Sequence, residues 1–259
     1  MGGHEREYEP GEYWSRVARE MGERSEGAFV AGDDTPFFRR KRELFVNRFL
    51  RAMPVSGRSV LEIGCGAGAN LVELARAEPD RLVGCDISRD MVDLARAATR
   101  GLPGVELVEL AQDGLPFASR SFDVTFTVTV LHHNHDAMLA ELIAEACRVT
   151  RERLYLFEDT APHKDERYSY VLRPVQEYDA LCRRNGFRLI ESKPLGLYTS
   201  WLVSAVIRAA LNPLRRREGE PVGKVNRVLE RIVLPATVTL DRVIPQRQGL
   251  TKMEFVRRD

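Results

Sequence analysis

The 259-residue chain is predicted to be an α/β protein with a mostly parallel sheet, and three observations support this prediction. Strand-like apolar runs alternate with helix-like amphipathic runs, which is typical of parallel sheets covered by helices. The run Val60-Leu-Glu-Ile63 leads directly into the glycine-rich segment Gly64-Cys-Gly-Ala-Gly68. A second run, Arg81-Leu-Val-Gly-Cys85, ends in Asp86. The glycines and the acid therefore follow strands, at the sheet edge where ligands of such folds bind.

The first 57 residues are expected to form helices and loops before the first strand. A helix is predicted to begin near Gly11, followed by a loop over residues 27–34. Residues 36–53 have helical periodicity, and Pro54 and Gly57 are expected to end that helix. Its apolar stripe consists of Phe38, Leu44, Phe45, Phe49 and Leu50.

Five strands and four helices are then expected to alternate. The predicted strands are 59–63, 81–86, 105–109, 124–129 and 153–158, and the predicted helices are 69–77, 88–100, 136–147 and 174–185. Ser88 and Asp90 are residue types that favour a helix start. Gly186, directly after Asn185, favours a helix stop.

Two further strands are predicted at 186–190 and 250–256, with residues 195–248 between them. This insert is longer than a tight hairpin needs, and helices are expected near 198–211 and 224–243. One interpretation is a cap that closes over the ligand cleft. The other is a membrane-facing element, in which apolar faces and the run Arg215-Arg-Arg217 would favour an anionic bilayer. The cap is favoured, because helices of this length are more often buried than membrane-bound.

The spacing of the glycines indicates which ligand the cleft binds. Gly64, Gly66 and Gly68 follow the pattern G-x-G-x-G, whereas a dinucleotide site requires G-x-G-x-x-G, and position 69 is Ala. The chain also lacks the G-x-x-x-x-G-K-[ST] loop of nucleoside triphosphate sites. Glycines allow close approach of backbone to a ligand, and Asp86 can accept hydrogen bonds from a ribose diol. The pattern therefore indicates a nucleoside-containing cofactor.

Several motifs resemble the class I S-adenosylmethionine-dependent methyltransferases. The matching segments are Val60-Leu-Glu-Ile-Gly-Cys-Gly-Ala-Gly68, Gly84-Cys-Asp-Ile-Ser-Arg-Asp-Met91, Leu115-Pro-Phe117, Ser121-Phe-Asp-Val124, Val130-Leu-His-His133 and Arg148-Val149. The resemblance implies a Rossmann-like, seven-stranded, mostly parallel sheet with an antiparallel last strand, preceded by N-terminal helices and carrying a helical insert between strands six and seven. The implied domains are a lead segment (1–57), a cofactor-binding core (58–194), a cap insert (195–248) and a final core strand (249–259).

The resemblance also implies S-adenosyl-L-methionine as the cofactor. In the family, the three glycines line the methionine end, the residue at Asp86 holds the ribose, and the residue at Ile87 packs on the adenine. The family's acid four residues before Leu115-Pro-Phe117 is replaced here by Ala111, so Asp113 is assigned the contact to the adenine amino group. The residues expected to bind the cofactor are Glu62, Gly64, Cys65, Gly66, Gly68, Asp86, Ile87, Met91, Gln112, Asp113 and Thr129.

Methyl transfer is an in-line displacement that needs alignment and exclusion of water, with a base only where the acceptor must lose a proton. The histidines after the fourth strand are the candidate bases, His133 first and His132 second. The alternative, which is favoured, is that they shape the loop and pack on the cofactor. No metal is expected, because the spacing of the nearby histidines and acids matches no metal signature.

Substrate-binding residues are harder to predict, because they differ between methyltransferases. Glu158 ends the fifth strand and could bind an amine or a hydroxyl group of the substrate. Tyr13 and Arg40 belong to the lead segment, and Tyr168 lies just beyond the fifth strand. Each could equally be a surface or packing residue.

Composition narrows the partners and the compartment. The formal net charge of +1 argues against nucleic-acid substrates, and the Asn-Pro-Pro-Tyr type of motif is absent after the fourth strand. The four cysteines form no C-x-x-C pair, which indicates a reducing, cytoplasmic compartment. The N-terminus is polar, so a secretory signal is not expected, and the longest apolar run (201–207) is too short to span a membrane.

The predicted function is transfer of a methyl group from S-adenosylmethionine to an O or N atom of a small, partly apolar biosynthetic intermediate. One alternative is a lipid or prenyl-quinone methyltransferase at a membrane surface, so peripheral membrane contact is possible but not favoured. Another is a non-catalytic subunit that binds the cofactor, and a redox dehydrogenase is the remaining rival. The oligomeric state and the acceptor are left open by the sequence.

Overall fold

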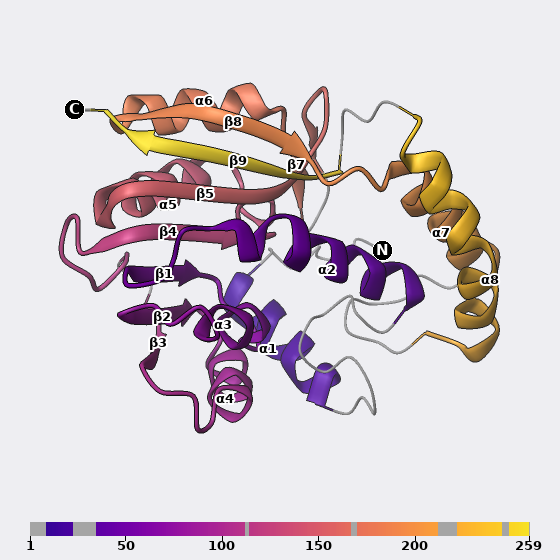
Figure 1. Ribbon diagram of the computed structural model, residues 1–259, viewed down its shortest axis with the longest axis horizontal. Coiled ribbons are helices and arrows are strands. Elements are labelled where there is room, and N and C mark those ends of the chain that lie inside the picture. Colours follow the sequence, from indigo (N-terminus) through magenta and orange to yellow (C-terminus); the bar gives the residue numbers. More distant parts are fainter. Residues whose placement is uncertain are drawn as a thin grey trace, which may run out of the picture.

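The computed structural model describes residues 9–22, 35–111, 114–166, 170–211, 222–244 and 249–258. Its centre is a seven-stranded sheet in the order β3-β2-β1-β4-β5-β9-β8 (Figure 1). Strands β1 to β5 pair in parallel, and β9 lies antiparallel between β5 and β8. The bounds are β1 (Ser59–Ile63), β2 (Arg81–Asp86), β3 (Val105–Glu109), β4 (Phe122–Val128), β5 (Thr150–Thr160), β8 (Phe187–Pro194) and β9 (Gly249–Arg257). The predicted fold class is confirmed.

This strand order defines where a ligand binds. From β1 the chain proceeds to β2 and β3 on one side, and then returns to β4 and β5 on the other side. The connections after β1 and β4 therefore diverge and leave a crevice at the carboxyl ends of these strands. The glycine-rich turn follows β1 and the histidine loop follows β4, so the topology brings both to this crevice.

Helices cover both faces of the sheet (Figure 1). The alternating residues Val60 and Leu61 of β1 belong to two separate apolar clusters, because successive side chains of a strand point to opposite faces. The first cluster joins the sheet to α2 and α3, and the second joins it to α5 and α6. The helices are α1 (Pro10–Gly22), α2 (Pro36–Arg48), α3 (Ala69–Ala75), α4 (Arg89–Ala98), α5 (Asp136–Val149) and α6 (Val175–Arg184).

Local chemistry explains several helix ends. Thr35 caps α2 by accepting a hydrogen bond from the Phe38 amide, and Pro36 occupies the first turn. Ser88 caps α4 in the same way, through the Met91 amide at 3.2 Å. Helix α2 ends at Arg48, earlier than predicted, because the chain tightens into a 3₁₀ turn at Leu50–Ala52.

Other boundaries also differ from the sequence prediction. Strand β5 runs to Thr160, where it still pairs with Gly249 of β9, and β8 extends to Pro194 because β9 also pairs along its whole length. Strand β4 stops at Val128, one residue before the predicted end, because Thr129 has a left-handed backbone (φ +56°). A short hairpin of β6 (Asp165–Glu166) and β7 (Val171–Leu172) was not predicted.

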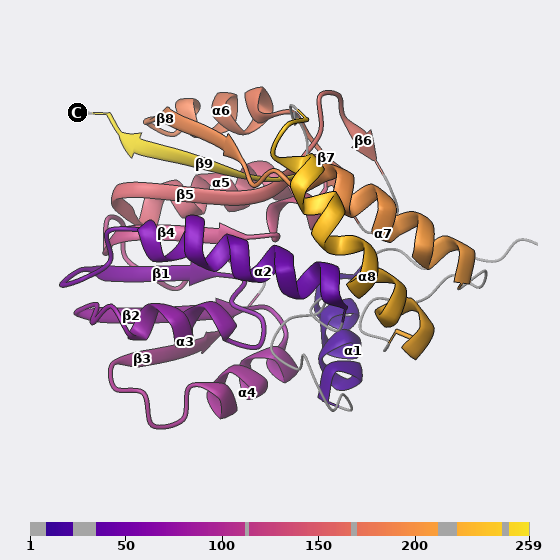
Figure 2. The same ribbon diagram turned by 45° about the vertical axis from the view of Figure 1, so that its right-hand side comes forward.

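The insert between β8 and β9 contains α7 (Tyr198–Leu211) and α8 (Lys224–Asp241), as predicted. The two helices pack against each other and against α2, beyond the carboxyl ends of the parallel strands (Figure 2). Where the insert leaves and rejoins the sheet, the Leu195 amide donates to the Leu250 carbonyl at 2.7 Å. None of the helices within the described ranges has the length and hydropathy that a membrane crossing requires.

Candidate functional site

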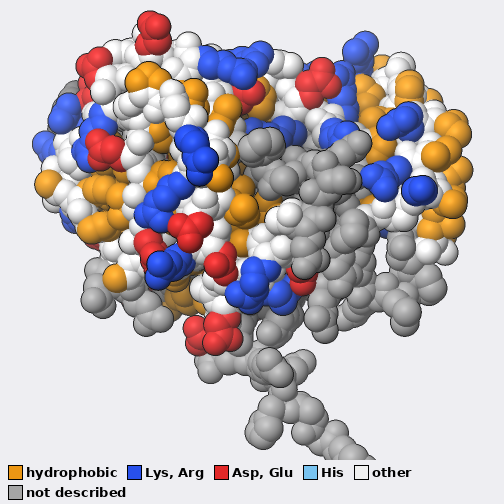
Figure 3. Space-filling view, turned by 90° about the horizontal axis from the view of Figure 1, so that it is seen from below, with side chains coloured by type: hydrophobic (Ala, Val, Ile, Leu, Met, Phe, Trp, Pro, Cys, Tyr) orange, Lys and Arg blue, Asp and Glu red, His pale blue; other side chains and the backbone are white. Residues whose placement is uncertain are grey.

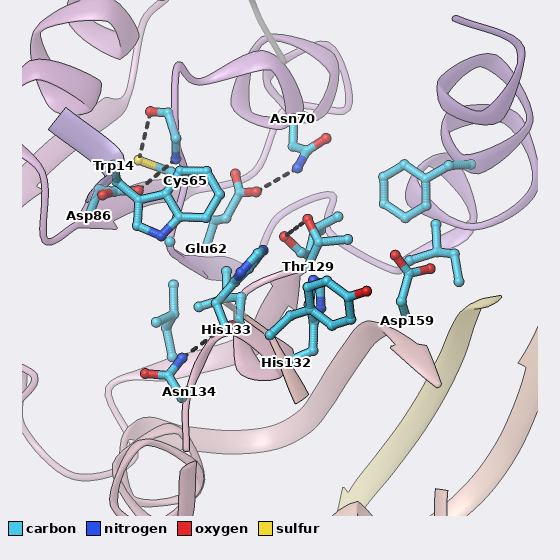
Figure 4. Close-up of a pocket in the computed structure, with 18 of the residues that line it drawn as sticks. Trp14, Glu62, Cys65, Asn70, Asp86, Thr129, His132, His133, Asn134 and Asp159 are labelled. Carbon is cyan, nitrogen blue, oxygen red and sulfur yellow. Dashed lines mark hydrogen bonds between the residues drawn. The ribbon is translucent and has the colours of Figure 1, made fainter. Parts of the chain in front are cut away.

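A cavity of about 1010 Å³ occupies the crevice at the carboxyl ends of the strands. Its walls come from the glycine turn after β1, the end of β2, the loop after β4, and the helices α1, α2 and α7. Figure 4 shows that Trp14, Glu62, His132 and His133 surround this space. The volume lies at the upper end of the range for small-molecule sites.

The glycine turn is held open by left-handed backbone. Gly64 has φ +71° and Gly66 has φ +51°, a conformation that side chains disfavour. A Cβ on Gly64 would lie 2.4 Å from the Val130 side chain, so this glycine lets the turn pack against the loop after β4. A Cβ on Gly66 would meet no atom within 4 Å, and Gly66 lines the cavity, as does Cys65.

Gly68 has a different role from the predicted cofactor contact. It does not line the cavity, and a Cβ there would lie 3.1 Å from the Ala95 Cα. Its φ is +83°. The third glycine of the motif therefore allows close approach of α3 to α4, and the prediction that it contacts the cofactor is not supported.

Asp86 links the glycine turn to the end of β2. Its carboxylate oxygens accept hydrogen bonds from the amides of Gly66 and Ser88, both at 2.9 Å. Burial raises the pKa of Asp86, and these amides offset part of that rise. Asp86 lines the cavity beside Ile87 and Met91, so a carboxylate that can accept from a diol lies next to an apolar wall.

Glu62, on β1 just before the glycine turn, supplies a buried hydrogen-bond acceptor. Its Oε1 accepts from Asn70 at 2.6 Å, and the Asn70 carbonyl oxygen accepts from Arg42 at 2.8 Å. Its Oε2 is buried and has no hydrogen-bond partner among the described residues. Burial raises the pKa of Glu62 to about 8, although Asn70 and Arg42 oppose this. Such an atom at a cavity wall fits a cationic ligand group.

Glu158 positions the loop after β4 and does not face the cavity. The residue is wholly buried, and its carboxylate accepts from the Thr127 hydroxyl at 2.8 Å and from the Val130 amide at 3.2 Å. It also pairs with His132 through the ring Nδ1 at 2.9 Å. Glu158 does not line the cavity, and its carboxylate is engaged by the loop after β4, so the structure gives no support to the predicted substrate contact.

The Glu158 contact orients the ring of His132. Nδ1 is engaged by the Glu158 carboxylate, so Nε2 is the ring nitrogen that is directed away from it. His133 is the next residue, with the two imidazole ring centroids 4.2 Å apart, and its ring also makes a T-shaped contact with the Trp14 ring at 4.9 Å. Both histidines line the cavity together with Thr129.

Two predicted substrate residues lie beside the cavity instead of on it. Tyr13 packs edge-on against Trp14, and it is Trp14 that lines the cavity. Arg40 pairs with Glu43 at the surface. The neighbouring Lys41 lines the cavity, with its ammonium 3.2 Å from the Asp159 carboxylate.

Asp159, next to Glu158, is the acid of β5 that faces the cavity. Burial raises its pKa, but Lys41 and the two histidines outweigh burial and leave the pKa below its ordinary value. Gln112, Asp113 and Tyr168 lie outside the described residues. Within the described ranges, no group of three or more His, Cys, Asp or Glu side chains could hold a metal ion.

Comparison with known proteins identifies the class. Residues 60–153 match a family model described as a methyltransferase domain. The match covers the glycine turn, Asp86 and the histidine loop, and the sheet around it has the order found above. The chain thus contains a class I S-adenosylmethionine-dependent methyltransferase domain, and the cofactor of this class is S-adenosylmethionine.

A curated relative is phthiotriol/phenolphthiotriol dimycocerosates methyltransferase 1 of Mycobacterium ulcerans (strain Agy99). It is 33% identical over 113 residues, which are 43% of this chain and 41% of that protein. The chain thus aligns with less than half of the length of this relative.

Two solved structures share the fold. The [4+2]-cyclase SpnF has a TM-score of 0.57 and 17% identity, over 85% of this chain and 81% of that one. Magnesium protoporphyrin IX methyltransferase from Synechocystis PCC 6803, solved with bound S-adenosylmethionine, has a TM-score of 0.54 and 16% identity, over 95% and 94%. At these identities the similarity concerns the fold alone.

Proposed function

We propose that this protein transfers the methyl group of S-adenosylmethionine to an O or N atom of a small molecule with a sizeable apolar part. The observation that carries the proposal is the continuity of the cavity. One end holds Glu62, Gly66 and Asp86, and the other is lined by apolar side chains of α2, α7 and the segments beside them. The lining residues at that other end are Phe37, Phe38, Phe45, Leu195, Leu197 and Trp201.

The residues at the first end fit the cofactor. Glu62 Oε2, buried and without a partner, would accept from the ammonium of the amino-acid tail. Asp86 would accept from the ribose hydroxyls, and Ile87 would pack on the adenine. When bound, the cofactor supplies a methyl group activated by the positive charge on sulfur.

The protein's own task is then to align the acceptor, exclude water and, where needed, remove a proton. We assign the proton acceptor to Nε2 of His132, ahead of His133. Glu158 fixes the orientation of this ring through Nδ1, much as a carboxylate orients the histidine of a catalytic triad. Trp14 and Trp201 line the cavity and would cover a bound acceptor.

A lipid acceptor is the second candidate. The apolar end of the cavity and the similarity to a protein named as a dimycocerosates methyltransferase both favour it. A non-methylating role is a third, since a [4+2]-cyclase shares the fold. Both methyl-transfer candidates expect a labelled methyl group in an extractable product, whereas the third candidate expects no labelled product.

The test supplies S-adenosylmethionine with a tritiated methyl group to the purified protein and a cell extract divided into aqueous and organic fractions. The proposal expects label in an extractable, partly apolar product. Label confined to a water-soluble polar product, or no transfer in spite of cofactor binding, would contradict it.

The base assignment is tested with His132→Ala and the matched control His135→Ala. His135 lies three residues away, is half-exposed, and pairs with Glu166 outside the cavity. For an acceptor that must lose a proton, His132→Ala is expected to lower kcat by about 10²- to 10⁴-fold with unchanged binding of S-adenosylhomocysteine. Equal rates for both variants would remove His132 from the chemistry.

A further inference from the structure

The fully buried side chains of the two insert helices are polar, although Leu234 and Val238 of α8 are partly buried and pack against the apolar core. The buried side chains of α7 are Ser200 and Ser204, and those of α8 are Asn226, Glu230, Thr237 and Asp241. Hydrogen bonds join these two sets. A helix pair on a water-exposed surface normally has the reverse arrangement, with its apolar side chains buried and its polar side chains facing the solvent.

The polar interior is specific and well connected. The Ser200 hydroxyl donates to Asp241 at 2.6 Å, and the Ser204 hydroxyl donates to Glu230 at 2.5 Å. The other Glu230 oxygen accepts from the Phe37 amide at 3.2 Å and so ties α8 to α2. The burial of the Ser200, Ser204, Glu230 and Asp241 side chains is therefore compensated, whereas the side-chain amide of the buried Asn226 has no hydrogen-bond partner among the described residues.

The exposed surface of the insert is largely apolar, and we call the surface formed by its exposed large apolar side chains the outer face. Of the fifteen large apolar side chains exposed among the described residues, eleven lie on it, and four lie elsewhere. On α8 they recur three or four residues apart, which places them on one side of the helix. The outer face consists of Trp201, Leu202, Val206, Leu211, Val225, Val228, Leu229, Ile232, Leu240, Val243 and Ile244.

The charges around the outer face have one sign. Lys224, Arg231 and Arg242 are exposed on α8 or directly after it, and Arg227 is half-buried there. The two acids of the described insert, Glu230 and Asp241, are buried in its interior. Figure 3 shows basic and apolar side chains together over the lobe of α7 and α8, on the right of the view. A surface of this kind attracts an anionic partner and repels a second copy of itself.

We infer that the outer face docks on an anionic lipid bilayer, with α7 and α8 lying in the interface. Interfacial helices combine an apolar face with flanking basic residues, whose long side chains reach the headgroups. Trp201 is 45% exposed, stacks with Tyr198 at 5.6 Å, and both also line the cavity. Tryptophan and tyrosine are enriched at the boundary between apolar and aqueous phases. Docking therefore brings the α7 end of the cavity to the membrane, independently of the proposed methyl transfer.

The experiment is flotation of the full-length protein with vesicles, without any methyl acceptor. Vesicles of phosphatidylcholine with 30% phosphatidylglycerol, roughly the negative surface of natural anionic membranes, are compared with pure phosphatidylcholine. The inference expects binding to the anionic vesicles that weakens with salt. The double variant Val228→Asp/Ile232→Asp is expected to bind at least tenfold more weakly, and Arg231→Glu/Arg242→Glu to lose the preference for anionic lipid.

The matched control is Ile190→Asp, which introduces the same charge at an apolar side chain that is also exposed (44%) but lies on β8. It is expected to float like the wild type, and binding of S-adenosylhomocysteine by all variants verifies folding. Two results would overturn the inference. One is equal flotation of the outer-face variants and the wild type. The other is no vesicle binding together with a dimer in sedimentation that Ile232→Asp dissociates, since the outer face would then be a contact between copies. If the wild type floats with anionic vesicles but transfers no methyl group in the labelling test, that result counts against the proposed function alone.

Discussion

Replacing Glu62 with Gln should remove a pH-dependent loss of stability. Burial raises the pKa of Glu62 from 4.5 to about 8. Between pH 4.5 and pH 8, the folded chain therefore keeps a proton on Glu62 that the unfolded chain has already lost. Because the folded state binds more protons in this window, the free energy of unfolding falls as the pH rises from 4.5 to 8. At 1.36 kcal/mol per pH unit the loss is about 5 kcal/mol.

Glutamine is the appropriate change because it keeps the shape and the acceptor for Asn70 while it cannot ionise. The assay is urea unfolding followed by circular dichroism at several pH values between 5 and 9, with no ligand. Relative to that of the wild type, the free energy of unfolding of Glu62→Gln should increase as the pH rises. Asp86 also has a raised pKa, but it is present in both proteins and cancels in the comparison. If the difference in free energy of unfolding between the two proteins stays constant across this pH range, the reasoning is refuted.

The same carboxyl makes a prediction about the ligand. An ammonium paired with Glu62 favours the ionised form and lowers its pKa, so S-adenosylhomocysteine should displace a proton when it binds near pH 7. Calorimetry in two buffers of different ionisation enthalpy measures this release. The Glu62→Gln variant should release none, and equal release by both proteins would assign the proton to another group.

Three more substitutions test the site and its support. Asp86→Asn should weaken binding of S-adenosylhomocysteine by about 10- to 100-fold in calorimetry, because a charged hydrogen bond is worth about 1.5–3 kcal/mol; unchanged affinity would exclude the ribose role. Gly68→Ala should lower the free energy of unfolding by about 2–3 kcal/mol through strain and contact with Ala95, and a second change, Ala95→Gly, should restore part of it. Arg173→Met should lower the free energy of unfolding in urea by about 3 kcal/mol, because the wholly buried guanidinium donates to the backbone carbonyls of Asn134 and Val171. An unchanged free energy of unfolding would show that water replaces the guanidinium.

The positions of the strands along the chain could be predicted because each strand has a distinct apolar run, whereas the direction of the last strand was implied by the family resemblance. The cofactor side was predictable for the same reason. Glu62, Gly66 and Asp86 sit at or beside strand ends, and a parallel sheet brings those ends together without any knowledge of side-chain packing.

The substrate side was less predictable, and the mismatches share one pattern. Trp14, Lys41 and Asp159 line the cavity, whereas the sequence pattern points to the residue directly before each. Neighbours differ by about 100° around a helix and alternate between faces along a strand, so a shift of one residue changes the side that a group faces. Which neighbour points inward depends on how α1, α2 and β5 sit against the core, and composition carries no signal for that.

Asn70 was missed for another reason. It lies on the first turn of the helix after the glycines, but its importance comes from the chain of hydrogen bonds from Arg42 to Glu62. The polar interior of α7 and α8 was equally hidden, since the same residues read as a conventional amphipathic pattern turned the other way. Periodicity gives the width of an apolar stripe and leaves open whether it faces inward.

The backbone hydrogen bond between Leu195 and Leu250 means that the insert departs from the sheet and returns to it at one point. Chain length between these residues can therefore change without altering how the last two strands pair. Evolution could replace the whole lobe while it keeps the cofactor-binding core, and so change both the substrate and the location of the protein in the cell. Protein engineers could graft a foreign lobe at the same junction and expect the sheet to fold as before.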